Sequence, residues 1–461
     1  MTDAGTPGAQ RKARTVAAGA VPSTEFALAQ TFAQAFADRL RYDHTAGAWY
    51  VWSGTCWRRD TVGKAHDMAR VHCLLASQGT EKHQRAATVR NVLELASRMD
   101  PLAVDHGAWD KDPWLLGTPG GIVDLRTGAL RRPAPEALIT KVTAVAPAAP
   151  GVVPALWTEF LSFVADDDRE RPLFLQRFLG YCLTGDVREH VLMFLWGGGG
   201  NGKSVLLNTV LHILADYGRV SPVQTFTSGA QDRHPVDKAM LAGARLVAAN
   251  ETEQGRAWAE AELKSLTGGD PITARFMHKN PFTFLPTFKL LIVGNHRPTI
   301  QSVDDAMRRR LVLVPFNRKP AAPDPELEAK LRAEAPAILR WMIDGCLDWQ
   351  EHGLPRPAAI AAATADYFEA QDSVGLWLSE CCEVGPTMHD SSRSLFQSWE
   401  AFQHAAGEHP GSGKSLTEAL KKRGFEQFRS SLYRGFRGLR VRASGVSDPR
   451  DRDGWVTHDD A

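Results

Sequence analysis

A run of glycines that ends in lysine and serine carries the residue types that bind a phosphate. The spacing Gly197-x-x-x-x-Gly202-Lys203-Ser204 matches the nucleotide phosphate-loop pattern. Residues without a Cβ let successive backbone N–H groups curl around a phosphate. The lysine would reach the β- and γ-phosphates, and the serine hydroxyl would be a ligand for Mg²⁺. The predicted phosphate site is made by Gly197, Gly198, Gly199, Gly200, Asn201, Gly202, Lys203, Ser204 and Val205.

The elements that position this loop are a buried strand before it and a helix after it. The five apolar residues 192–196 predict the strand, and the Lys-Ser-Val-Leu-Leu sequence from residue 203 predicts the start of the helix. The positive end of that helix would add to the attraction for an anion. A flexible glycine linker is the alternative, but a linker would not follow an apolar run and end in Gly-Lys-Ser.

Two further apolar strands end in polar residues that could complete the chemistry. Residues 244–249 lead to Asn250 and Glu251, and an acid at the end of a buried strand beside a phosphate loop is where Mg²⁺ and an attacking water need one. A solvated strand terminus is the alternative interpretation of Glu251. Residues 288–293 lead to Asn295, an amide of the kind that orients water near a γ-phosphate.

Two basic segments could act away from this loop. Arginines at positions 308–310 precede the apolar strand 311–316, where a solvated charge run is the usual interpretation and an approach to a neighbouring subunit's nucleotide is the functional one. Residues 276–284 predict a hairpin with His278 and Lys279 at its tip. One imidazole and one cation suit contact with phosphates without base recognition, whereas an ordinary polar turn is the plain alternative.

Composition limits the classes of protein that the chain could belong to. The 461 residues are 43% hydrophobic and 23% charged with a net charge of +1, so any nucleic-acid surface must be local. No apolar run is long enough to span a membrane, and residues 1–22 lack a signal-peptide core and are expected to form a disordered tail. The six cysteines contain no Cys-x-x-Cys pair, which predicts reduced, buried thiols in a cytoplasmic protein.

The C-terminal segment holds the basic patch that the whole-chain charge conceals. Residues 411–442 contain nine Lys and Arg against two Glu, a local net charge of +7. A short helix and two strands are predicted there, which suits duplex DNA, while a solvated or protein-contact domain is the alternative. The predicted DNA contacts are Lys421, Lys422, Arg423, Arg434 and Arg437.

Taken in order, these motifs resemble the superfamily 3 helicases. The resemblance rests on the phosphate loop, Glu251, the Lys-Ser-Leu-Thr-Gly-Gly-Asp sequence 264–270, Asn295, and Arg-Arg before the strand 311–316. The most similar branch is that of the phage and plasmid primase–helicases, which are related to the poxvirus replicative primase–helicase. The resemblance covers most of the chain.

The resemblance implies a role for each matching residue. Lys203 and Ser204 would hold the phosphates and Mg²⁺ of ATP, and Glu251 would be the Walker B acid and a metal ligand. Family members often have two adjacent acids there, whereas this chain has Asn250 before Glu251 and Glu253 two residues on, so the division between the two acids stays open. Asn295 would be the γ-phosphate sensor. Arg309 or Arg310 would be an arginine finger acting on the next subunit of a hexamer, and His278 and Lys279 would form the pore hairpin that grips single-stranded DNA.

The implied fold is α/β, with an AAA+-like P-loop NTPase core, a helical collar, an N-terminal α+β domain and a C-terminal winged-helix domain. The expected divisions are a tail 1–22, the N-terminal domain 23–150, the collar 151–190, the ATPase core 191–345, a helical connector 346–384, the winged helix 385–445 and a tail 446–461. In the N-terminal domain the tryptophan-rich stretch 49–57 is interpreted as core rather than as a base-stacking surface.

The implied function is an ATP-dependent DNA helicase of phage, prophage or plasmid replication, moving 3′→5′ on single-stranded DNA as a homo-hexameric ring. Primer synthesis is not expected, because the residues before the collar show no Asp-x-Asp on a strand. A separate primase or polymerase is a possible partner, and no membrane is. The alternative is a primase-associated or origin-opening ATPase that binds DNA without processive translocation.

Overall fold

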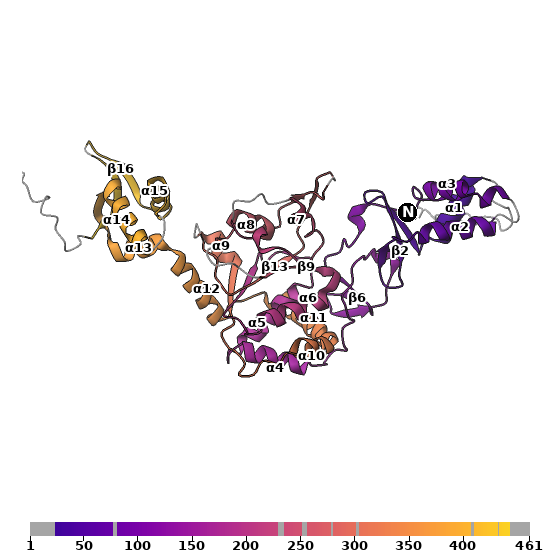
Figure 1. The fold of residues 1–461 in the computed structure, drawn as a ribbon, viewed down its shortest axis with the longest axis horizontal. Helices are drawn as coiled ribbons and strands as arrows, with labels where there is room; N and C mark the ends of the chain where they lie inside the picture. Colours follow the sequence, from indigo (N-terminus) through magenta and orange to yellow (C-terminus); the bar gives the residue numbers. More distant parts are fainter. Residues whose placement is uncertain are drawn as a thin grey trace, which may run out of the picture.

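The computed structural model describes residues 24–76, 81–228, 235–250, 256–277, 280–300, 304–406, 410–431 and 433–442. Figure 1 shows three groups of elements, with the N-terminal helices at one end, a sheet with helices in the middle and a small helix-and-strand group at the other end. Among the described residues, no helix is long and apolar enough to cross a membrane.

The central group is built on a five-stranded parallel sheet. Its strands lie in the order β14-β8-β13-β10-β9, and every neighbouring pair is parallel. They are β8 (Leu192–Trp196), β9 (Gly218–Val220), β10 (Leu246–Asn250), β13 (Lys289–Gly294) and β14 (Leu311–Pro315). The expected mixed α/β fold with a parallel sheet is therefore confirmed.

Both faces of this sheet are covered, which is why its strands are continuous apolar runs. Met193 and Leu195 of β8 belong to one buried cluster, and Leu192 and Phe194 belong to another. The first cluster includes residues of α4 (Ala155–Val164), α5 (Glu170–Tyr181), α6 (Lys203–Leu214), α10 (Leu327–Ala333) and α11 (Ala335–His352). The second includes residues of α8 (Glu260–Gly268) and α12 (Ala358–Gln371). Helices α4, α5, α10 and α11 gather on one side of the sheet in Figure 1.

Further short elements belong to the central group. β11 (Ile272–Ala274) and β12 (Phe282–Phe284) form an antiparallel hairpin. α9 (Asp305–Arg310) leads directly into β14, and its N-cap Asp304 accepts a hydrogen bond from the Met307 amide. The five-residue helix α7 (Pro235–Ala239) precedes β10.

The N-terminal group combines three helices with two small sheets. α1 (Glu25–Ala35), α2 (Lys64–Ala76) and α3 (Ala86–Ala96) share one buried cluster. One sheet has the order β3-β2-β1-β4, with β1 (Leu40–Asp43), β2 (Ala48–Trp52), β3 (Trp57–Arg59) and β4 (Ala103–Val104). The other contains β5 (Leu115–Thr118), β6 (Gly121–Asp124) and β7 (Ala129–Arg131). Trp57 is fully buried and donates a hydrogen bond to the Pro135 carbonyl, so this tryptophan is a core residue.

The C-terminal group packs three helices against a three-stranded sheet. Its elements are α13 (Ser373–Cys381), β15 (Cys382–Ser391), α14 (Ser392–Ala405), α15 (Gly413–Lys422), β16 (Glu426–Arg429) and β17 (Arg434–Val441). The sheet order is β15-β17-β16, and both pairs are antiparallel. Trp377 of α13 lies in the same buried cluster as Leu395, Leu416 and Leu439, so this packing unit begins ahead of residue 385.

Candidate nucleotide site

The predicted loop connects the C-terminal end of β8 to the N-terminus of α6. Gly200 and Gly202 have φ angles of +76° and +88°, in the left-handed region that residues with a Cβ avoid. A Cβ at Gly197 would lie 2.0 Å from the Phe316 carbonyl oxygen, at a φ of +154°. Gly200 and Gly202 are therefore required by backbone conformation, and Gly197 by the close approach of the segment after β14.

Lys203 is the first residue of α6, and its side chain folds back over the loop. Its Nζ donates to the carbonyl oxygens of Gly197 at 2.6 Å and Gly198 at 3.2 Å, and to Oδ1 of Asn201 at 2.8 Å. Lys203 is 4% exposed, and burial followed by the charge of Lys319 lowers its pKa. The partners of this ammonium are neutral oxygens, so its charge is free to be balanced by an anion at the loop.

A cavity of about 270 Å³ opens at this edge of the sheet. It is lined by residues 199–205 of the loop, by Asn250 at the end of β10, and by Val293, Gly294 and Asn295 at the end of β13. Parallel register brings these strand ends together, because Asn250 pairs with Val293 and Gly294 pairs with Trp196. The structure therefore places Asn295 beside Lys203 and the exposed Ser204.

Asn250 lines the same cavity, although it was not predicted as a site residue and was noted only because it precedes Glu251. The signal that could have found it is the one used for Asn295, a polar residue at the end of a buried parallel strand. Its side-chain amide adds a second neutral polar group to the cavity opposite the loop.

Several predicted residues lie outside the described part of the chain. Glu251 and Glu253 follow the last described residue of β10, and His278 and Lys279 lie between Met277 and Asn280. Their roles stay predictions. The described residues contain no group of three or more His, Cys, Asp or Glu side chains that could hold a metal ion, so Ser204 is the described candidate for Mg²⁺.

The predicted arginine fingers lie near the N-terminal ends of the parallel strands, whereas the phosphate loop of the same chain lies at the C-terminal ends. α9 precedes β14, and Leu311 at the start of β14 pairs with Leu192, whereas Pro315 at its end pairs with Trp196. Leu311 and Pro315 are four residues apart along the strand, so the two ends are separated by about 13 Å. The two arginines also differ. Arg310 donates to Thr267 Oγ1 at 3.1 Å, whereas Arg309 is exposed and, among the described residues, its side chain donates to the Asp305 carbonyl of its own helix.

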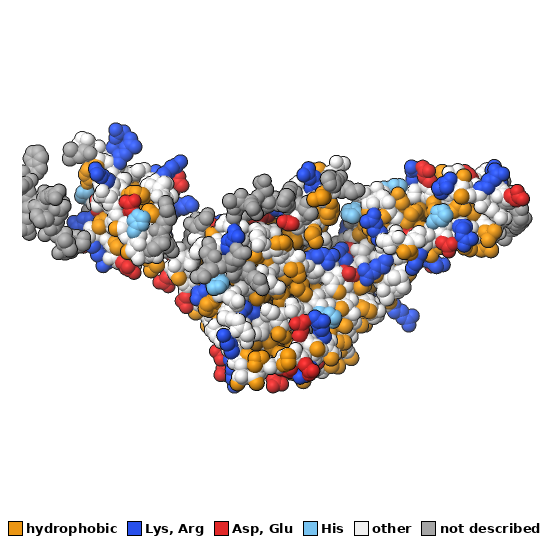
Figure 2. Space-filling view, viewed as in Figure 1, with side chains coloured by type: hydrophobic (Ala, Val, Ile, Leu, Met, Phe, Trp, Pro, Cys, Tyr) orange, Lys and Arg blue, Asp and Glu red, His pale blue; other side chains and the backbone are white. Residues whose placement is uncertain are grey.

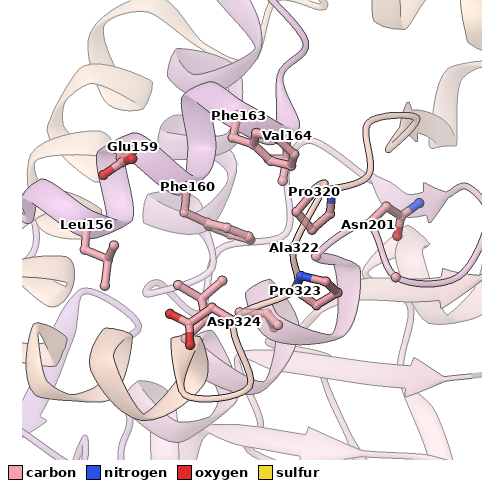
Figure 3. A pocket seen from close by; sticks show the side chains of 14 residues that line it. Leu156, Glu159, Phe160, Phe163, Val164, Asn201, Pro320, Ala322, Pro323 and Asp324 are labelled. Carbon is pink, nitrogen blue, oxygen red and sulfur yellow. The ribbon is translucent and has the colours of Figure 1, made fainter.

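A second, apolar cavity of about 330 Å³ adjoins the other side of the phosphate loop. Figure 3 shows Phe160, Phe163 and Val164 from α4 facing Pro320, Ala322 and Pro323 from the segment after β14. The loop forms part of its wall, and a Cβ at Gly202 would lie 2.8 Å from the Phe160 ring. No sequence motif predicted this cavity, because its walls come from segments more than a hundred residues apart.

The predicted DNA contacts of the C-terminal group are mostly exposed. Leu416 and Leu420 anchor α15 in the core, which leaves Lys421 and Lys422 at its exposed end. Arg434 and Arg437 are exposed on β17, and Figure 2 shows Lys and Arg side chains at several points around this group. Arg423 differs, because it forms an ion pair with Asp372, the N-cap residue of α13. Arg423 therefore joins two elements of the group.

Comparison with known proteins finds two matching family models and viral relatives with helicase and primase names. Residues 29–180 match the family described as D5 N terminal like, and residues 195–310 match a family of unknown function, DUF5906. A protein of Acanthamoeba polyphaga mimivirus that carries a helicase name is 27% identical over 298 residues, 58% of this chain and 31% of that protein. A protein of African swine fever virus that carries a primase name is 26% identical over 162 residues, 34% of this chain and 17% of that protein.

The apo structure of the NrS-1 C-terminal region is 11% identical, covering 91% of this chain and 99% of that chain with a TM-score of 0.49. The chain spans less than a third of the length of the two viral relatives. The two matched segments and the viral relatives support a place for this chain in a phage and viral primase–helicase family.

Proposed function

We propose that the protein is an ATP-dependent DNA helicase that assembles as a ring and unwinds duplex DNA during phage, prophage or plasmid replication. The observation that carries the proposal is the buried Lys203 ammonium, held over a glycine loop by neutral oxygens beside a cavity at the ends of three parallel strands. A triphosphate is the anion that this arrangement would bind, because the helix N-terminus, the loop amides and the lysine all favour negative charge.

In this proposal the nucleotide is bound across the loop. Lys203 would exchange its loop carbonyls for β- and γ-phosphate oxygens, and Ser204 with Glu251 would hold Mg²⁺, which neutralises charge on the transferred phosphoryl group. Asn295 at the end of β13 would orient the attacking water. The apolar cavity beside Phe160 would take the nucleobase, because an aromatic ring and prolines offer stacking surface on the far side of the same loop.

The separation of α9 from the loop supports catalysis between subunits. Since Arg309 and Arg310 lie about 13 Å along the sheet from the loop of their own chain, an arginine from α9 would act on a neighbour's nucleotide. Arg309 suits this role better than Arg310, whose guanidinium is held by Thr267 in its own subunit. A ring of subunits supplies such a neighbour at every site, and a homo-hexamer is the proposed assembly.

The proposed DNA contacts divide between the ring and the C-terminal group. His278 and Lys279, in the hairpin between β11 and β12, would hold the backbone of single-stranded DNA in the pore. The C-terminal group has the helix and strand order of a winged helix, and its α15 and β17 cations would hold the phosphates of duplex DNA. Both contacts are with the backbone, so the proposed binding is largely independent of sequence.

An origin-opening or primase-associated ATPase is the second candidate. It would share the nucleotide site and the C-terminal cations but would not translocate. The primase name of one viral relative favours a place near primer synthesis, although this chain covers only 17% of that protein.

Unwinding of forked DNA with 3′ or 5′ tails, in the presence of ATP and Mg²⁺, tests the proposal and gives the direction of movement. Lys203→Ala should lower ATP hydrolysis by at least about 100-fold, because the phosphate charge loses its main partner. Lys279→Ala should abolish strand displacement, whereas Lys111→Ala, at an exposed lysine in the N-terminal part, should not. If Lys279→Ala unwinds like the parent protein, the origin-opening ATPase is favoured; if Lys203→Ala retains full turnover, the nucleotide site is wrong.

Mixing variant subunits tests catalysis across the interface. Arg309→Ala and Lys203→Ala subunits are each inactive alone, but in a mixed ring some interfaces pair an intact Arg309 with an intact Lys203. ATPase activity should therefore reappear on mixing. Arg310→Ala is the matched control, and it should retain activity on its own. If no mixture regains turnover, Arg309 does not act in trans.

A further inference from the structure

The segment after β14 is fastened to the phosphate loop by its first residue. The Phe316 amide donates to the Trp196 carbonyl at 2.7 Å, immediately before the loop begins. The Phe316 carbonyl accepts from Nδ2 of Asn201, which lies inside the loop. Because Oδ1 of the same Asn201 accepts from Lys203, the segment and the loop lysine are joined through one buried side chain.

The next residues of this segment lie beside α4 and the phosphate loop. The Arg318 guanidinium lies 4.8 Å from the centre of the Phe163 ring on α4, and Pro320 lines the apolar cavity. Lys319, between them, lies over the loop. A Cβ built on Gly198 would be 3.6 Å from its Cε and 3.7 Å from its Nζ. The Lys319 side chain therefore fills the space into which a side chain at position 198 would extend.

Two ammonium groups thus converge on one short stretch of backbone. Lys203 reaches the Gly198 carbonyl from α6 at 3.2 Å, and Lys319 covers Gly198 from the segment after β14. No ion pair among the described residues includes Lys319, which is exposed. Like charges in this position repel each other, and an anion bound at the loop would remove that repulsion.

We propose that Lys319 is a nucleotide-contacting residue that binds the polyphosphate held by the phosphate loop of its own subunit. The inference rests on the proposed nucleotide site and adds a second cation to it. Lys319 would bind the phosphate oxygens that face Gly198, while Lys203 binds those that face the helix. Because the hydrogen bonds of Phe316 hold this segment against the loop of its own chain, Lys319 would contact the nucleotide of its own subunit, whereas the arginine finger would come from a neighbouring subunit.

Binding of ATP, of inorganic tripolyphosphate and of adenosine to the full chain tests this role. Lys319→Ala should weaken ATP and tripolyphosphate binding by about 10-fold or more, the effect of losing one charge-assisted contact, and should leave adenosine binding unchanged. Lys319→Arg should restore most of the affinity, because the charge is kept. Lys111→Ala, at an exposed lysine far along the sequence, should bind all three as the parent does.

Two measurements distinguish a direct contact between Lys319 and phosphate from a structural effect of the substitution: the salt dependence of nucleotide affinity, and the ATPase activity of mixed variant subunits. The affinity difference between the parent and Lys319→Ala should shrink as salt rises, since a charge contact is screened. Because both lysines act on one nucleotide, mixing Lys319→Glu with Lys203→Ala subunits should not restore ATPase activity, and recovery would overturn the assignment to the same subunit. If Lys203→Ala loses ATP while Lys319→Ala binds it normally, the Lys319 role is wrong and the nucleotide site stands. If the parent protein binds no nucleotide, the proposed function itself fails.

Discussion

Gly197→Ala offers a sharp test of how the segment after β14 is joined to the phosphate loop. In the structure the new Cβ would lie 2.0 Å from the Phe316 carbonyl oxygen, whereas ordinary contact begins at 3.4 Å. Phe316 or the loop must therefore move by more than about 1 Å. Gly199→Ala is the matched control two residues away, since a Cβ there meets nothing within 4 Å.

The cost of this movement follows from the contacts it breaks. The hydrogen bonds from the Phe316 amide to Trp196 and from Asn201 to the Phe316 carbonyl are each worth about 1 kcal/mol. The φ of +154° at position 197, which alanine adopts poorly, adds about 1–2 kcal/mol. A loss of about 3 kcal/mol in the free energy of unfolding follows, and it corresponds to about 6–12 °C in melting temperature for a domain of this size.

Thermal unfolding without nucleotide measures this cost directly. Gly197→Ala should melt about 6–12 °C below the parent protein, and Gly199→Ala should melt within about 2 °C of it. Adding ATP and Mg²⁺ should raise the melting temperature of the parent by ligand linkage, and should raise that of Gly197→Ala much less, because the loop is displaced. If both alanine variants melt alike, the close approach of Phe316 does not fix the loop.

Two further predictions concern buried and exposed cations. Burial lowers the pKa of Lys289, which is 2% exposed, to about 7, so between pH 7 and about 10 the unfolded chain binds a proton that the folded chain lacks. Stability should therefore rise with pH over this window by at most about 5 kcal/mol, and Lys289→Met should remove that rise; equal slopes of urea-derived stability against pH in both proteins would contradict it. Arg434→Ala should weaken duplex DNA binding and lower the slope of log affinity against log salt by about one, with Arg90→Ala as a control on the N-terminal helices. An unchanged slope would remove Arg434 from the DNA surface.

The local sequence around the loop was enough to predict its structure. Residues 192–214 form a strand, a glycine loop and a helix that begins at Lys203, as the apolar run and the Gly-Lys-Ser sequence predicted. The short helix and the two strands predicted within residues 411–442 are likewise present as α15, β16 and β17. These predictions succeed because periodicity and glycine placement act over a few neighbouring residues.

Other features depended on packing between distant segments. The sequence could not tell Arg309 from Arg310, whereas in the structure the exposure of Arg309 and the hydrogen bond from Arg310 to Thr267 distinguish them. The sequence also predicted a C-terminal domain that begins at residue 385, whereas Trp377 and Cys382 already belong to the hydrophobic core of that domain. Neither contact has a pattern in the local sequence.

By itself, the sequence determined that a phosphate loop lies between a buried strand and a helix, because the glycines, Lys203 and Ser204 lie within eight residues. Only the tertiary structure decided what meets that loop. Because both sheet faces are buried, β8 packs between β13 and β14. Asn295 and the segment 316–319 therefore follow the C-terminal ends of their strands beside the loop, whereas Arg309 lies near the N-terminal end of β14. Strand order is set by apolar packing across the whole chain, which no single stretch of sequence contains.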